Sequence, residues 1–346
     1  MKHIRIGIMG FGRIGRQLYK LAQEHERFDV VAISDIGQPE ILHHLLTKTL
    51  DRSGQVRLEG NYLVDKHGSR TRLMPANHPT EIPWDVFDVD LVIDATGRFR
   101  SKPELMPHLQ NGARRVISSV LPDDGMDRVV LYGVNDQEAS VDDKVISAGS
   151  ATTTATALAV QTLTEARAID QVSMTSIHEY TSDQSLRDYA GPDYRRSRSG
   201  AENIIPNTSP ARTWVQRLVP AVDGKFSSYA MNVPVPVGSL LDLTVVFKDP
   251  VDVATVNALF ETAARNQPRL IATTSALIVS SDVKGSPQSL LVDLQGTICT
   301  GRMVKILGWH ETLGHASRIL DVAALYDDLD AEHGTGRHTE RHQEAS

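Results

Sequence analysis

The feature that most constrains the fold is a run of spaced glycines close to the start of the chain. An alternating apolar segment at positions 4–8 predicts a strand, and apolar residues at helical spacing begin at position 14. The residues that join the two segments are Gly10, Phe11, Gly12, Arg13, Ile14 and Gly15. A strand, a glycine-rich turn and a helix in this order predict the first unit of a parallel sheet with crossover helices.

Each glycine of this turn has a physical role in binding a dinucleotide. Gly10 permits the tight turn, Gly12 lets a pyrophosphate approach the backbone, and Gly15 lets the helix pack closely on the strand. The N-terminus of the helix offers unpaired amides and a partial positive charge to phosphates. We therefore expect all six residues of the turn to take part in cofactor binding.

A carboxylate follows the second predicted strand. The apolar segment at 28–33 ends with Ser34 and Asp35. An acidic residue at this place can bond the 2′-hydroxyl of an adenosine ribose and repels a 2′-phosphate. Asp35 therefore favours NAD over NADP as the cofactor. The alternative role for this side chain is a cap on the strand.

The order of the remaining segments predicts two domains. Strand-like and helical segments alternate as far as residue 150, and strand-like segments dominate after it. We expect an α/β fold, with a Rossmann-type, doubly wound parallel sheet over residues 1–150 and an α+β domain with a mixed or antiparallel sheet over 151–315. A last helix at 316–329 is expected to pack back on the first domain, and the polar segment 330–346 is expected to be disordered. Within the second domain, a helix is expected at 151–167 and strands at 172–177, 229–233, 240–247, 276–280, 290–294 and 303–309.

Composition narrows the class of protein. The 346 residues carry a formal net charge of −7, which gives no positive surface for nucleic acid or for an anionic membrane. No apolar run approaches the roughly 20 residues of a membrane span. The single cysteine, Cys299, excludes an intrachain disulfide and fits a reducing compartment. We expect a cytoplasmic protein that binds small molecules, with Cys299 as an ordinary strand residue.

Seven short segments along the chain together form a recognisable pattern. They are Gly-Phe-Gly-Arg-Ile-Gly-Arg at 10–16, Ala-Thr-Gly-Arg-Phe at 95–99, Gly-Ala-Arg-Arg-Val-Ile-Ser at 112–118, Tyr-Gly-Val-Asn at 132–135, His-Glu-Tyr-Thr-Ser-Asp-Gln at 178–184, Arg-Arg-Ser-Arg-Ser-Gly-Ala-Glu-Asn-Ile-Ile-Pro at 195–206 and Met-Val-Lys-Ile-Leu-Gly-Trp at 303–309. In this order they resemble the phosphorylating glyceraldehyde-3-phosphate dehydrogenases, and the resemblance covers residues 3–328. It implies an NAD cofactor that is also bound by Thr96, Gly97 and Ser118, and a homotetramer in which the basic loop at 187–198 crosses a subunit interface.

The resemblance breaks at the residue that carries the family's chemistry. The family motif Ser-Cys-Thr-Thr-Asn supplies a thiolate that attacks the aldehyde, and Ala151 stands at the position of that cysteine. A methyl group cannot form an acyl-enzyme. The resemblance also assigns His178 as the base that would activate the thiolate. The histidine is therefore present while its nucleophile is absent.

Two further departures concern ligand contacts. The family carries an arginine at the position of Asn232, and an asparagine offers only a neutral amide of shorter reach. Either the ligand is not a phosphorylated triose, or another basic residue such as Arg212 replaces the arginine. After Trp309 the chain is one residue shorter than the family pattern, and Thr312 stands nearest to the asparagine that would bond the nicotinamide. The substrate and anion contacts that the resemblance retains are Ser150, Thr152, Thr181, Asp183 and Ser209.

Two functions remain open from the sequence. The first is an NAD-binding pseudoenzyme that cannot run the acyl-thioester oxidation and has a regulatory or assembly role, as a homotetramer or together with an active paralogue. The second is an NAD-dependent oxidoreductase that transfers a hydride without covalent catalysis, with His178 as the base for a different aldehyde or alcohol. A small, anionic ligand is compatible with both functions.

Overall fold

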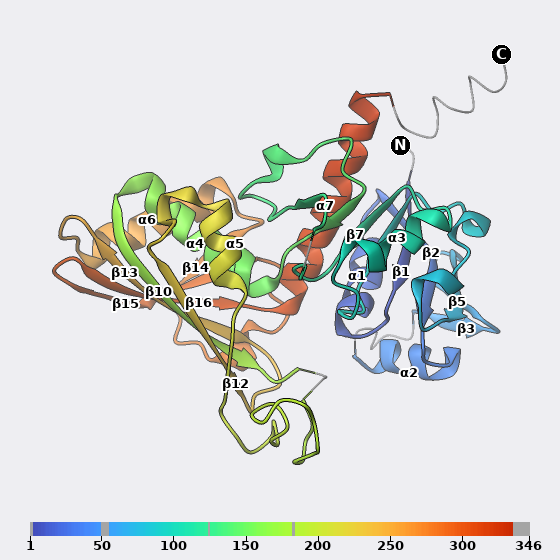
Figure 1. Cartoon of the computed structure of the whole chain (residues 1–346), viewed down its shortest axis with the longest axis horizontal. Coiled ribbons are helices and arrows are strands. Elements are labelled where there is room, and N and C mark those ends of the chain that lie inside the picture. The colour runs from blue at the N-terminus through green and yellow to red at the C-terminus, as the bar shows by residue number, and fades with distance from the viewer. Residues whose placement is uncertain (1–2, 50–54, 124, 182–183, 335–346) are drawn as a thin grey trace. The chain divides into compact units, whose positions relative to one another are not determined.

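The computed structural model describes residues 3–49, 55–123, 125–181 and 184–334 (Figure 1). The chain forms two compact units. The first is built from the residues up to Ser150 together with those from Ala316 onward, and the second is Ala151–His315. Within the described ranges, no helix combines the length and the apolar character needed to cross a membrane.

A sheet of nine described strands forms the centre of the first unit. All its strand pairs are parallel except β3–β4 and β4–β5. The strand order reverses at β1, which has β2 on one side and β6 on the other, and doubly wound sheets bind ligands at the carboxyl ends of the strands at such a point. In spatial order the strands are β3 (Arg57–Glu59), β4 (Tyr62–Val64), β5 (Arg70–Pro75), β2 (Phe28–Asp35), β1 (Ile4–Met9), β6 (Leu91–Asp94), β7 (Arg115–Ser118), β9 (Val145–Ser147) and β8 (Arg128–Val129).

Helices cover both faces of this sheet. On one face, Ile6 and Ile8 pack with α1 (Arg13–Gln23) and with Ile319 of α7 (Thr312–Glu332). On the other face, Val92 packs with α3 (Lys102–Gln110) and the short helix η2 (Trp84–Phe87). Burial on both faces explains why β6 begins with three consecutive apolar residues. The remaining helical segments of this unit are α2 (Pro39–Thr49), η1 (Pro79–Glu81) and η3 (Asp136–Glu138).

The last helix is longer at both ends than the sequence predicts. α7 begins at Thr312 and ends at Glu332, so that residues 330–332, which we expected in the disordered segment, are helical. Asp330 forms a buried ion pair with Arg115 of β7, and the hydroxyl of Tyr326 donates to Oδ2 of Asp143 at 2.8 Å. These polar contacts extend the helix beyond its apolar face, which ends at residue 329. Residues 335–346 lie outside the described residues.

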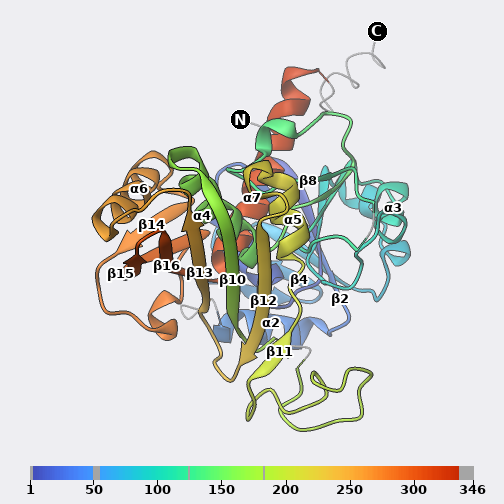
Figure 2. The same cartoon turned by 60° about the vertical axis from the view of Figure 1, so that its left-hand side comes forward.

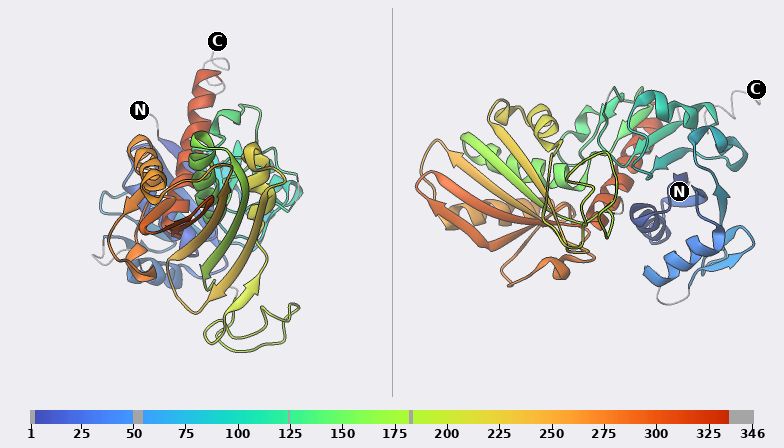
Figure 3. Two further views of the ribbon diagram at one scale, coloured as in Figure 1. Left: turned by 90° about the vertical axis from the view of Figure 1, so that its left-hand side faces the viewer. Right: turned by 60° about the horizontal axis from the view of Figure 1, so that its bottom comes forward.

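The second unit contains a mixed sheet of seven described strands (Figures 2 and 3). The pairs β10–β12 and β14–β15 are parallel, and the other pairs are antiparallel. The helix α4 (Ala151–Ala166) packs on β10, β15 and β16, while α5 (Ala211–Leu218) packs on β12 and α6 (Val253–Asn266) on β14 and β15. The strands in spatial order are β11 (Ile205–Asn207), β12 (Phe226–Val233), β10 (Ile169–Glu179), β13 (Ser239–Phe247), β16 (Met303–His310), β15 (Leu290–Thr300) and β14 (Ile271–Thr274), and the short helices are η4 (Pro220–Val222) and η5 (Ser280–Val283).

The α/β fold class is confirmed, and individual elements differ from the prediction. The strand expected at 276–280 is wrong: β14 occupies 271–274, and the following residues form a loop in which Leu277 is 91% exposed. The periodicity also missed α5 and the small antiparallel extension β3–β4–β5. These elements are eight residues long or shorter, so each shows too few turns or pairs for a clear pattern.

Candidate functional site

The glycine turn of the first unit is shaped for close approach of a ligand. Gly10 has a φ of +90°, and a β-carbon there would lie 2.8 Å from the amide nitrogen of Thr96. A β-carbon on Gly15 would lie 2.1 Å from the carbonyl oxygen of Gly10, whereas one on Gly12 would meet no atom within 4 Å. Gly10 and Gly15 are therefore required by the fold, and Gly12 borders open space at the N-terminus of α1. This arrangement fits a pyrophosphate held by backbone amides.

The carboxylate of Asp35 joins the end of β2 to this turn. Its Oδ2 accepts a hydrogen bond from the amide of Phe11 at 2.6 Å, and its Oδ1 accepts one from the amide of Gly37 at 2.9 Å. The side chain is partly exposed. It therefore does more than cap its own strand, because it also fixes the second residue of the glycine turn. Its contact with a ribose remains a prediction.

The turn after β6, at residues 95–97, lies against the glycine turn at Gly10, and we call these two turns together the cofactor cradle. The amide and the hydroxyl of Thr96 both donate to Oδ1 of Asp94, at 3.0 and 2.6 Å. Gly97 follows with a φ of +69°, and Ser118, fully buried at the end of β7, accepts a hydrogen bond from the amide of Val120 at 3.3 Å. β6 and β7 lie beyond β1 in the strand order. The predicted cofactor residues of this unit therefore gather at adjacent carboxyl ends, including Arg13 and Ile14 at the start of α1.

A row of polar side chains crosses the second sheet at one end. His178 on β10 pairs with Asn232 on β12, and Ser239 on β13 pairs with His310 on β16. Because Ile177 pairs with Leu240, His178 also faces Ser239. In-register partners project to the same face of a sheet. We call Asn232, His178, Ser239 and His310 the polar row.

The hydrogen bonds of His178 select one form of its ring. Nδ1 lies 3.3 Å from the carbonyl oxygen of Glu179 and 3.4 Å from Oγ of Ser239. A carbonyl oxygen only accepts, so Nδ1 carries the proton and the neutral ring has its lone pair on Nε2. This tautomer suits a general base whose orientation is fixed by its other nitrogen.

His310 is a second imidazole at the same end of the sheet. Its ring centre lies 5.8 Å from that of His178, and its Nε2 lies 3.4 Å from Oγ1 of Thr152 on α4. Burial, and after it the repulsion from the imidazoles of His178 and His315 when these are protonated, lowers the pKa of His310 to about 3. His310 is therefore uncharged near neutral pH. It contributes a polar but neutral group beside His178.

Ala151 is the first residue of α4 and is partly buried. Thr152, which follows it, is buried and lies beside His310, and Ser150 precedes the helix. The N-terminus of α4 carries the partial positive charge that would stabilise an anion. The chain thus places a methyl group, and no nucleophile, at the first position of this helix.

The amide of Asn232 is used within the protein. Its Nδ2 donates to the carbonyl oxygen of Glu179 at 3.3 Å, and its Oδ1 accepts from Nδ2 of Asn207 at 3.2 Å. Asn232 is buried, with only 5% of its surface exposed. Arg212 lies on the exposed side of α5, where its Nε donates to Gln216 at 3.3 Å. The two hydrogen bonds of Asn232 therefore link the neighbouring strands β11, β12 and β10.

The other predicted ligand contacts lie in several places. Thr181 donates its amide to Oε1 of Gln184 at 3.1 Å, and the hydroxyl of Ser209 accepts from the amide of Ala211 at 3.2 Å. Thr312 begins α7 and donates to the carboxylate of Glu311 at 3.2 Å. Asp183 lies outside the described residues. The roles of these four residues remain predictions.

Two members of the polar row escaped the sequence analysis as site residues, namely Ser239 and His310. A signal for Ser239 exists in the sequence, because β13 alternates buried and partly exposed residues and Ser239 falls on the buried, otherwise apolar set. His310 ends a run of three buried residues on β16 and is visible only from its pairing. The pairing of strands distant in sequence cannot be read from periodicity.

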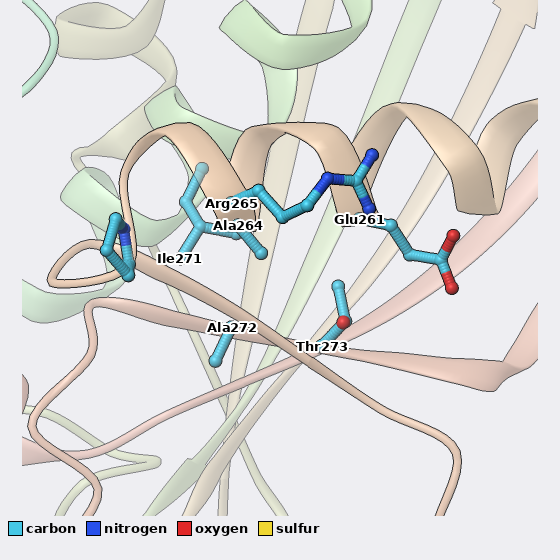
Figure 4. Close-up of a pocket in the computed structure, with 7 residues that line it drawn as sticks. Glu261, Ala264, Arg265, Ile271, Ala272 and Thr273 are labelled. Atoms are coloured by element: carbon cyan, nitrogen blue, oxygen red, sulfur yellow. The ribbon is translucent and has the colours of Figure 1, made fainter.

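A pocket elsewhere in the second unit is separate from the polar row. It lies between α6 and β14 (Figure 4), and its Arg265 donates within its own helix to Oγ1 of Thr262 at 2.9 Å. None of the predicted site residues lines it. The lining residues are Glu261, Ala264, Arg265, Pro268, Ile271, Ala272 and Thr273.

Comparison with known proteins identifies the family. Residues 4–102 match the sequence model of the glyceraldehyde 3-phosphate dehydrogenase NAD binding domain, and residues 150–312 match that of the C-terminal domain. The glyceraldehyde-3-phosphate dehydrogenase of Haloarcula vallismortis is 36% identical over 326 residues, which are 92% of this chain and 97% of that protein. The enzyme of that name from Streptomyces coelicolor is 36% identical over 331 residues, 93% of this chain and 98% of that protein. This chain therefore belongs to the glyceraldehyde-3-phosphate dehydrogenase family, and its cofactor is NAD.

Proposed function

We propose that this protein binds NAD but does not perform the phosphorylating oxidation through an acyl-thioester. The observation that carries the proposal is Ala151 at the start of α4. The family resemblance puts the attacking thiolate at this position, where a helix N-terminus lowers a thiol pKa. A methyl group supplies neither a thiolate nor a leaving group for acyl transfer.

Cys299 is not a substitute for the missing thiol. It lies on β15 and pairs with Val304, six residues along β16 from His310. At about 3.3 Å per residue this separation is on the order of 20 Å. Burial and the negative charge of Asp252 raise the pKa of the Cys299 thiol, which disfavours the reactive thiolate.

The polar row also supports a change of ligand. Asn232 replaces the family's arginine, and its amide group forms hydrogen bonds with Glu179 and Asn207. None of the four side chains in the row is a lysine or an arginine. A phosphate would therefore lack the bidentate cation that usually holds it. We propose that the ligand of this site is not a phosphorylated triose.

The experiment begins with titration of the purified protein with NAD in a calorimeter. The protein is then assayed with glyceraldehyde 3-phosphate, NAD and phosphate, beside an Ala151→Cys variant. We expect NAD to bind to both, no turnover by the parent, and at best weak turnover by the variant, since Asn232 is unchanged. Parent turnover that is lost in His178→Ala would overturn the proposal.

A second candidate function is an NAD-dependent oxidoreductase without covalent catalysis. The tautomer of His178 favours it, because Nδ1 is held by Glu179 and Ser239 while Nε2 is the basic nitrogen. In this function Nε2 would accept the hydroxyl proton of an alcohol, and the carbon that carries this hydroxyl would give its hydride to NAD. A screen of uncharged alcohols and aldehydes, read by NADH absorbance, tests it. Activity should be lost in His178→Gln and kept in His44→Gln, a matched change on the surface of α2.

We propose a cytoplasmic homotetramer for either function, or a mixed assembly with an active paralogue in the regulatory role. Support comes from the loop at 187–198, where Tyr194 is 97% exposed and Tyr189 is 46% exposed. Aromatic side chains that project from a surface loop suit a subunit interface. Light scattering should report four copies, and Tyr194→Ser should shift the assembly toward smaller species. A monomeric parent at micromolar concentration would contradict this assignment.

A further inference from the structure

A chain of buried hydrogen bonds links the interior of the first unit to the cofactor cradle. Nε1 of Trp84 donates to Nδ1 of His108 at 2.9 Å, and Nε2 of His108 lies 3.4 Å from Oδ2 of Asp94. Trp84 and His108 have no exposed surface, and Asp94 is 1% exposed. Asp94 in turn accepts both hydrogen bonds from Thr96 through its other oxygen. The chain therefore runs from η2 through α3 to the turn after β6.

The donors and acceptors of this chain have one consistent arrangement. The indole nitrogen of Trp84 can only donate, so Nδ1 of His108 must accept and carries no proton. His108 is then neutral, with its proton on Nε2, and this nitrogen donates to Asp94. Because Thr96 donates twice to the other oxygen, the carboxylate of Asp94 accepts from both sides. A buried carboxylate needs such donors, since it is costly to remove from water.

Asp94 controls where the turn at 95–97 lies. The amide of Thr96 is held by Asp94, and the same amide nitrogen lies 2.8 Å from the place of a β-carbon on Gly10. The hydroxyl of Thr96 also accepts from the amide of Arg98 at 3.1 Å, which fixes the following residue. The two turns that border the cofactor cradle are thus packed against each other. A shift of the Asp94 carboxylate would move one of them.

We propose that His108 is a positioning residue for NAD binding. The proton on its Nε2 holds the Asp94 carboxylate, the carboxylate holds Thr96, and Thr96 sets the wall of the cradle opposite the glycine turn. The hydrogen bonds of the His108 ring go to Trp84 and Asp94, so its effect on the cradle passes through Asp94. Its contact with Trp84 fixes the ring and its tautomer and makes no separate contribution to NAD affinity.

Three substitutions at position 108 separate this role from simple packing. A glutamine places an amide nitrogen near the position of Nε2 and keeps the donor to Asp94. An asparagine places an oxygen near the position of Nδ1 and keeps only the acceptor for Trp84. A leucine keeps neither. His108→Gln and His108→Asn each retain one arm, so both should lower the melting temperature while differing in NAD affinity.

The test measures the Kd for NAD by calorimetry, and folding by circular dichroism and melting temperature. We expect His108→Asn and His108→Leu to raise the Kd about tenfold, because a buried acceptor loses its donor, and His108→Gln to raise it less than about threefold. Equal affinity in parent and folded His108→Asn would overturn the proposal, as would an equal loss in His108→Gln and His108→Asn. If His108→Leu fails to fold, the comparison of glutamine with asparagine still decides. Because the readout is NAD binding, the result does not depend on which reaction the second unit performs.

Discussion

The α-carbon of Gly15 lies so close to the carbonyl group of Gly10 that a β-carbon on Gly15 would come within 2.1 Å of the carbonyl oxygen. A carbonyl oxygen of the backbone cannot move aside as the end of a flexible side chain can. α1 and the turn after β1 must therefore separate to admit any residue other than glycine. We predict that Gly15→Ala lowers the free energy of unfolding by about 1–3 kcal/mol, as other overpacked sites do.

Gly12 provides the matched control in the same turn. Its φ of −70° is open to every residue, and a β-carbon there meets no atom of the protein. Gly12→Ala should therefore change the free energy of unfolding by less than about 1 kcal/mol. The substitution should nevertheless weaken the binding of NAD, because a methyl group would occupy the space that the pyrophosphate approaches. Denaturant titration and calorimetry on both variants check the pair, and a fully stable Gly15→Ala protein would contradict the packing argument.

The buried ion pair between Arg115 and Asp330 anchors the end of α7. Arg115 also donates to the carbonyl oxygens of Asp143 and Val141, at 2.8 and 2.6 Å, and its guanidinium lies 4.9 Å from the ring centre of Tyr326. We predict that Arg115→Met lowers the free energy of unfolding by about 3 kcal/mol, the lower end of the range for a broken buried ion pair, because Asp330 keeps only the longer ion pair with Arg114 at 3.7 Å. Denaturant unfolding measures the loss.

The double variant distinguishes an ion pair from lost packing. Arg115→Met combined with Asp330→Asn removes both charges, so that no buried carboxylate is left with only the longer ion pair to Arg114. The double variant should therefore be more stable than Arg115→Met alone. The single variant Asp330→Asn completes the comparison, and losses that simply add in the double variant would show that Arg115 and Asp330 do not stabilise each other.

Cys299 should react slowly with alkylating agents. Burial and the charge of Asp252 raise its pKa, so that less thiolate is present near neutral pH than in a free cysteine. We predict a rate with iodoacetamide below that of a cysteine-containing peptide at pH 7.5, and a rise in rate as the pH is raised. Mass spectrometry of the labelled protein gives the rate. Fast labelling at pH 7.5 would make this thiol a candidate nucleophile again.

The parts of the fold that follow from local pattern could be predicted. The glycine turn, Asp35 and the alternation of strands with helices predicted the sheet of the first unit, because each depends on residues close together in sequence. The strand expected at 276–280 failed because apolar residues in a loop resemble a short strand, and Leu277 is in fact exposed. The helical residues 330–332 were missed because an ion pair with Arg115, more than 200 positions away, holds them in place.

The candidate site also has features that local sequence predicts and others that depend on contacts between distant segments. Ala151 and Asn232 were recognisable from the motifs that surround them, since each replaces one residue in an otherwise matching segment. The polar row was not, because it needs the register of β12, β10, β13 and β16 to bring its members together. The use of the Asn232 amide by Glu179 and Asn207 is likewise a consequence of this register.

His310 should make the protein less stable in acid. Its pKa is about 3 in the folded protein, below the ordinary histidine value of 6.5, because burial, and repulsion from His178 and His315 when these are protonated, oppose its protonation. Between these values the unfolded chain binds a proton that the folded chain does not, so stability falls as the pH falls. The free energy of unfolding therefore falls by about 1.4 kcal/mol for each pH unit below 6.5.

We predict that His310→Gln, which cannot titrate, loses roughly 2 kcal/mol less than the parent between pH 7 and pH 5. Denaturant unfolding at both pH values measures the difference, and His44→Gln, an exposed change on α2, should behave as the parent does. Equal losses in His310→Gln and the parent would mean that His310 is protonated in the folded protein at pH 5.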